Sequence, residues 1–116
     1  MNRFSKEEAR RLIANCDQEG LDANLHAAVL CNEYNVAVVA IEAGADVRQF
    51  ARPTPLLSVA IQNRNFPIFE LLMSHPNIDI NARDLLGVSV IEHASKVPQF
   101  ASYLEIYQSQ FLKAFV

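Results

Sequence analysis

Few side chains of this 116-residue chain have the types and the spacing that chemistry requires. Cys31 and His26 could form a nucleophile–base pair, but they lie five positions apart, whereas residues that share a helix face are three or four apart. His93 follows Glu92, yet there is no His-Glu-x-x-His motif and no second metal ligand four residues away. The three glycines form no phosphate-binding loop, and the carboxylates form no acid–base pair. We therefore predict a protein that is not an enzyme and that carries no metal and no cofactor.

Charge and cysteine content restrict the partners and the compartment. A net charge of −3 argues against nucleic acid and against an anionic membrane surface, because both attract clustered lysines and arginines. Cys16 and Cys31 are too few for a disulfide framework and favour free thiols in a reducing compartment. The longest aliphatic run, residues 36–41, is far too short to cross a bilayer, and the charged first residues do not resemble a signal peptide. We expect a single-domain cytoplasmic protein.

The sequence repeats at a period of about 33 residues. Asp46 and Asp79 are 33 positions apart, and the small residues Ala28, Ala60 and Ala94 follow one another at steps of 32 and 34. A period of this length is typical of stacked helical units, none of which buries its apolar face alone. Such a stack leaves a long side surface open, and we predict that this surface holds another macromolecule.

Helix signals recur within each unit. Ser5 and Glu8 form a capping box, residues 17–20 form a turn cluster, and Gly44 and Pro98 are typical of a helix end and a helix start. The second helix of each unit begins with an aromatic residue. We predict helices over residues 6–16, 23–30, 34–43, 56–62, 66–74, 89–96 and 98–115.

Four short segments of the sequence resemble parts of ankyrin repeats, namely residues 25–28, 42–47, 54–56 and 84–87. The resemblance implies an all-α fold, an ankyrin-type solenoid in a single domain. Its parts would be an N-terminal capping helix at 1–19 and repeats at 20–52, 53–86 and 87–116, the last with a long C-terminal capping helix. The glycine of the family's inter-helix turn is replaced by Asn32, Arg64 and Pro98. Asparagine adopts the left-handed conformation readily, and we expect the turn at Arg64 to be altered.

The resemblance also implies that a protein partner docks on the hairpin tips and on the exposed side of each first helix. The matching residues are Arg48, Gln49, Phe50, Arg52, Gln62, Asn63, Arg83, Leu85, Leu86 and Lys96. Phe50, Leu85 and Leu86 are apolar where a solvated tip is normally polar, and arginines beside apolar groups are typical of interface hot spots. Alternatively, the two leucines fold back onto the next unit. We predict a non-catalytic protein–protein interaction module that acts as an adaptor or as an inhibitor.

The final helix carries an aromatic stripe of Phe100, Tyr103, Tyr107, Phe111 and Phe115, at steps of three or four. This stripe is a candidate self-association surface, which would make the protein a homo-oligomeric scaffold. Alternatively, the stripe covers the open end of the third unit, or the chain is a fragment of a longer array.

Overall fold

The computed structural model describes residues 3–51 and 54–113, with side chains for residues 3–49 and 54–107. This part of the chain is predominantly helical and contains one short hairpin, which places the protein in the all-α class. The helices are α1 (Lys6–Ile13), α2 (Gln18–Cys31), α3 (Tyr34–Glu42), α4 (Leu56–Gln62), α5 (Phe66–Met73), α6 (Val90–Ser95) and α7 (Pro98–Lys113). Strands β1 (Phe50–Ala51) and β2 (Thr54–Pro55) form the hairpin.

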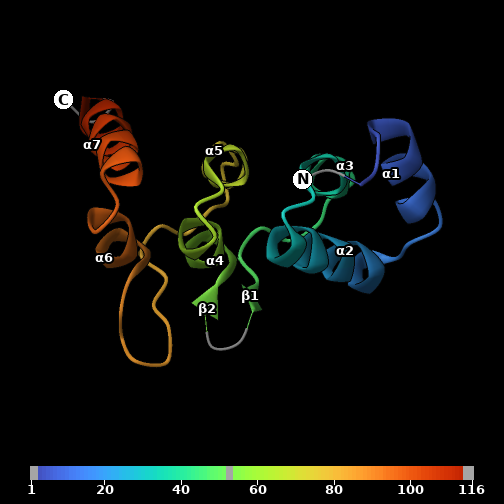
Figure 1. The fold of residues 1–116 in the computed structure, drawn as a ribbon, viewed down its shortest axis with the longest axis horizontal. Helices are drawn as coiled ribbons and strands as arrows, with labels where there is room; N and C mark the ends of the chain where they lie inside the picture. Colours follow the sequence, from blue (N-terminus) through green and yellow to red (C-terminus); the bar gives the residue numbers. More distant parts are fainter. Residues whose placement is uncertain (1–2, 52–53, 114–116) are drawn as a thin grey trace.

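The molecule measures 42 × 32 × 24 Å, and its elements form three rows along the longest axis (Figure 1). Helices α2, α4 and α6 form the middle row. Helices α1, α3, α5 and α7 lie on one side of it, and the β1–β2 hairpin and the loop before α6 lie on the other side. The middle row is therefore covered on one side by helices, while the hairpin and the loop project from its other side.

The N-terminal helices differ from the prediction in their bounds. Helix α1 begins at the expected capping box but ends at Ile13, three residues early. Helix α2 begins at Gln18, five residues before the expected start, because the side chain of Asp17 accepts a hydrogen bond from the backbone N–H of Gly20. The sequence predicts that Asp17 lies in a turn, whereas the structure shows it as the residue that caps the next helix.

The two inter-helix turns of the first two helix pairs share one geometry. Asn32 and Arg64 both adopt the left-handed conformation, with φ of 60° and 56°. The residue after each of them donates its backbone N–H to an alanine carbonyl, Ala28 in one turn at 2.8 Å and Ala60 in the other at 2.9 Å. The expectation of an altered turn at Arg64 was therefore wrong, since closing this turn outweighs the ordinary reluctance of arginine to adopt a positive φ.

Each helix of the middle row carries a buried alanine. Ala28, Ala60 and Ala94 are all buried in one continuous apolar core. A larger side chain at such a position would force the helices apart at a cost of about 1–3 kcal/mol. The repeated alanines thus set the spacing of the middle row.

Candidate functional site

The first hairpin is built mainly by main-chain pairing. Strands β1 and β2 are antiparallel, and the backbone N–H of Leu56 donates to the carbonyl of Gln49 at 3.0 Å. Asp46 organises the approach to the hairpin, because its carboxylate accepts the backbone N–H of Arg48 at 2.8 Å and its carbonyl accepts the side-chain amide of Gln49 at 2.9 Å. The side chain of Arg48 is left exposed.

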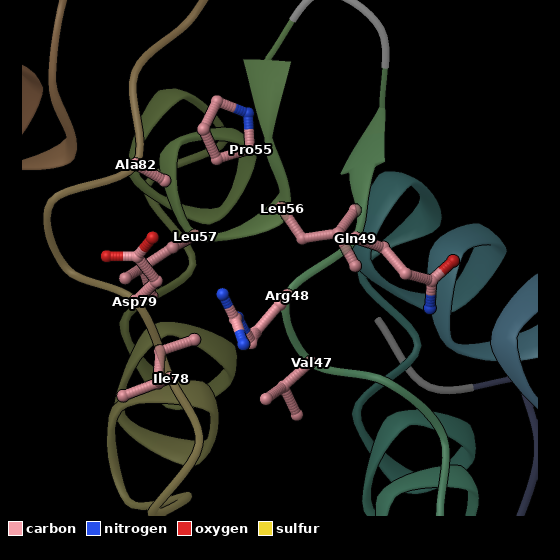
Figure 2. A pocket seen from close by; sticks show the side chains of 9 residues that line it. All are labelled: Val47, Arg48, Gln49, Pro55, Leu56, Leu57, Ile78, Asp79 and Ala82. Carbon is pink, nitrogen blue, oxygen red and sulfur yellow. The ribbon is translucent and has the colours of Figure 1, made fainter.

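A shallow hollow of about 70 Å³ lies beside this hairpin. Figure 2 shows the guanidinium of Arg48 pointing into the space between its own segment and the segment that carries Ile78 and Asp79. Arg48 forms no ion pair with a carboxylate in the described part of the chain. The hollow is lined by Val47, Arg48, Gln49, Pro55, Leu56, Leu57, Ile78, Asp79 and Ala82. Its walls are mostly apolar, Arg48 and Asp79 are the charged residues in its lining, and its volume is below that of an ordinary small-molecule pocket.

The loop before α6 is built by one side chain instead. One carboxylate oxygen of Asp84 accepts the backbone N–H groups of Leu86 and Val88, both at 2.9 Å, and the other lies 3.3 Å from Nε2 of His93 on α6. These contacts, the Val88 hydrogen bond first, hold the pKa of Asp84 below its usual value. Gly87 closes the turn by donating its N–H to the carbonyl of Asp84 at 3.0 Å, with a φ of 82° that favours glycine.

Leu85 and Leu86 are the central residues of this turn, and we call them the leucine tip. Their exposed fractions are 85% and 87%, so they do not fold back onto a neighbouring unit, and that alternative is wrong. Arg83 braces the turn from one side, because its guanidinium donates to the carbonyl of Gly87 at 2.8 Å and lies 3.5 Å from the carboxylate of Glu92. The tip is therefore a rigid projection with two apolar side chains in solvent.

The remaining partner-binding candidates do not join the tip. Gln62 is the last residue of α4, while Asn63 and Lys96 are the C-caps of α4 and α6. Helix α4 starts at the hairpin and is about 10 Å long, so Gln62 and Asn63 lie at the end of α4 that is far from the hairpin, and Lys96 lies at the corresponding end of α6. Asn63 also donates to the carbonyl of Val29 at 3.4 Å, which ties α4 to α2.

Two further candidates are only partly described or not described at all. Phe50 belongs to β1, but its side chain lies outside the described residues, as does the whole of Arg52. The hairpin surface is therefore defined here by five described residues, namely Arg48, Gln49, Arg83, Leu85 and Leu86.

The described residues of the aromatic stripe pack against the core. Phe100 is 1% exposed, and its ring packs at a centroid distance of 4.8 Å, edge to face, against Phe69 of α5. Tyr103 packs against the same ring at 5.5 Å, and burial raises the pKa of its hydroxyl. Phe100 is therefore removed from the candidate self-association surface, because a buried ring cannot meet a second copy. Tyr107 is half-buried against the core, while Phe115 and the side chain of Phe111 lie outside the described residues.

Other chemistry is sparse in the described part of the chain. Cys16 is half-buried and Cys31 exposed, both as free thiols. No three His, Cys, Asp or Glu side chains among the described residues are grouped so that they could hold a metal ion. Within the same residues, no helix combines the length and apolar character needed to cross a bilayer.

One feature of the structure had no sequence-based prediction. The buried carboxylate of Glu33 binds Arg3, thirty positions earlier in the chain. A glutamate directly before a predicted helix was the available signal, because that position usually holds a capping residue.

No family model matches the sequence, and no curated protein matches it either.

Proposed function

We propose that this chain is a small ankyrin-type array that binds a protein partner through its hairpin surface, without catalysis, as an adaptor or an inhibitor. The free cysteines favour a cytoplasmic location as part of the same proposal.

Two equivalences and one contact between neighbouring units support an array. Asp46 and Asp79 each accept the backbone N–H two residues further on, at 2.8 Å and 2.9 Å. Asn32 and Arg64 share the left-handed turn. The side-chain amide of Asn65 donates to the side-chain oxygen of Asn32 at 3.1 Å, which joins two turns 33 positions apart. Repeated contacts of this kind are expected when one supersecondary unit is stacked on another.

The leucine tip carries the binding proposal. An exposed leucine contributes nothing to the core, and burying one against a partner stabilises a complex by about 1.5–3 kcal/mol. Because Asp84 and Gly87 already hold the turn, little conformational entropy is lost when a partner covers it. The guanidinium of Arg48, which pairs with no carboxylate among the described residues, points into the hollow beside the preceding hairpin and offers a partner a polar contact there.

The test compares affinity capture from a lysate with three baits: the wild-type chain, the double variant Leu85→Ala/Leu86→Ala, and the control Leu12→Ala/Leu30→Ala. Leu12 and Leu30 are also exposed, but they lie on α1 and α2. We expect proteins that both the wild type and the control retain and that the tip variant loses, at an unchanged melting temperature. Identical captured sets for all three baits would contradict the proposal.

A further inference from the structure

Residues Arg3 and Phe4, which we call the arm, are bound to the turn between α2 and α3. Both carboxylate oxygens of Glu33 are engaged, one by the backbone N–H of Arg3 at 2.8 Å and the other by its Nε at 2.7 Å. The side-chain amide of Asn35 donates to the carbonyl of Phe4 at 2.8 Å. The guanidinium carbon of Arg3 lies 5.8 Å from the centre of the Phe4 ring, within cation–π range. Glu33 and Asn35, which we call the dock, thus contact one side chain and the main chain of a bent, non-helical segment.

The dock is complementary to a cation. With the arm in place Glu33 is 4% exposed, and a covered carboxylate is stabilised when a cation pairs with it. The side-chain hydrogen bond of Arg3, followed by its backbone hydrogen bond, holds the pKa of Glu33 below its usual value. An unoccupied dock would therefore hold a carboxylate that favours any incoming arginine, whose planar guanidinium suits a carboxylate better than an ammonium does.

The next helix pair shows that this carboxylate is not needed for the helix itself. Asn65 occupies the equivalent position and caps α5 by accepting the backbone N–H of Ile68 at 3.1 Å. Glu33 occupies the same position before α3 and makes no capping hydrogen bond. Its side chain is directed to the arm instead, which marks the dock as a special feature of the first turn.

The arm lies at the surface and can leave without opening a helix. The side chain of Arg3 is 72% exposed, and Phe4 is half-buried. Helix α1 begins directly after the arm, and its own capping box holds that start: Ser5 accepts the backbone N–H of Glu8, and Glu8 accepts that of Ser5, both at 3.1 Å. Release of the arm would therefore leave α1 capped.

We propose that Glu33 and Asn35 form a recognition site for a short, non-helical peptide segment in which an arginine precedes an aromatic residue, and that the resting protein fills this site with Arg3 and Phe4. A partner segment of this type binds by displacing the arm, and the arm sets the threshold that the partner must exceed. The site is separate from the hairpin surface, and the inference does not rest on the function proposed above.

The test uses a capped pentapeptide with the sequence Met-Asn-Arg-Phe-Ser and the full-length variant Arg3→Ala, in which the dock lacks its arginine. Binding is followed by NMR at the backbone amides of Glu33 and Asn35. We expect saturable binding to the variant in the millimolar range. Half-saturation of the wild type should need about tenfold more peptide, since a tethered arm competes at a millimolar effective concentration. A peptide with alanine in place of arginine should bind at least about tenfold more weakly.

A folded Arg3→Ala variant that ignores the peptide would overturn the proposal, and so would equal binding of the arginine and alanine peptides or equal half-saturation of variant and wild type. If Arg3→Ala does not fold, the variant Arg3→Lys retains a cation against Glu33 but loses the planar contact. The peptide should then half-saturate Arg3→Lys at a lower concentration than it needs for the wild type. Equal half-saturation concentrations would also overturn the proposal.

Discussion

Two groups of apolar residues near the C-terminal end of the described chain have opposite environments. The leucine tip projects into solvent from a turn held by Asp84. Phe100, by contrast, lies on α7 and is buried against Phe69 of α5. Both groups suggested an interaction surface in the sequence. The difference teaches that apolar residues at helical spacing pack against a neighbouring helix, while apolar residues inside a turn closed by Asp84 and Gly87 have no neighbour to cover them.

The largest effect that would sharpen this comparison is the loss of Phe100. We expect Phe100→Ala to lower the free energy of unfolding by about 3–5 kcal/mol, because it removes a ring from a packed aromatic cluster and leaves a cavity. Urea denaturation measures the change. The control is Ile106→Ala on the exposed side of the same helix, which should cost no more than about 0.5 kcal/mol. Similar losses for the two variants would mean that α7 does not pack on α5 as described.

The second prediction concerns the side chain that builds the leucine tip. In Asp84→Ala the backbone N–H groups of Leu86 and Val88 lose their acceptor. We expect both amides to exchange with solvent at least about tenfold faster, since local opening then costs less free energy. The control Asp79→Ala removes a carboxylate that accepts a single N–H, from Asn81, and should leave the tip amides unchanged. Unchanged exchange in Asp84→Ala would show that the turn holds without this carboxylate.

A third prediction follows from the pKa of Asp84, which is lower in the folded protein than in the unfolded chain. Its stabilisation is fully present above the unfolded pKa of about 4 and is lost as the pH falls through the lower folded pKa. As the pH falls through this acidic window, we expect the stability of the wild type to fall more steeply than that of Asp84→Asn. The asparagine at position 84 does not titrate. Denaturation curves from pH 6 to pH 2 measure both slopes, and parallel curves would contradict the assignment.

The sequence predicts most of the helices but not the contacts made by individual side chains. Helices α3, α4 and α5 begin where expected, at Tyr34, Leu56 and Phe66, because aromatic, proline and capping signals are local. The pairing of Asp84 with His93 and of Glu33 with Arg3 could not be predicted, because each joins residues that only the folded chain brings together. Apolar character alone also did not separate the tip from the buried ring, since burial depends on which helix packs opposite.

The smallest effect on stability is expected where the functional proposal is strongest. Leu85→Ala/Leu86→Ala should change the free energy of unfolding by no more than about 0.5 kcal/mol, because both side chains are already in solvent and alanine retains the backbone N–H that Leu86 donates to Asp84. Thermal denaturation beside the wild type measures this difference. A loss of about 2 kcal/mol would show that the leucines pack in solution, which would remove the contrast with Phe100. If the variant keeps its stability but no longer captures the partner, the two leucines act in binding. The loss of capture then cannot result from unfolding, because the fold is as stable as in the wild type.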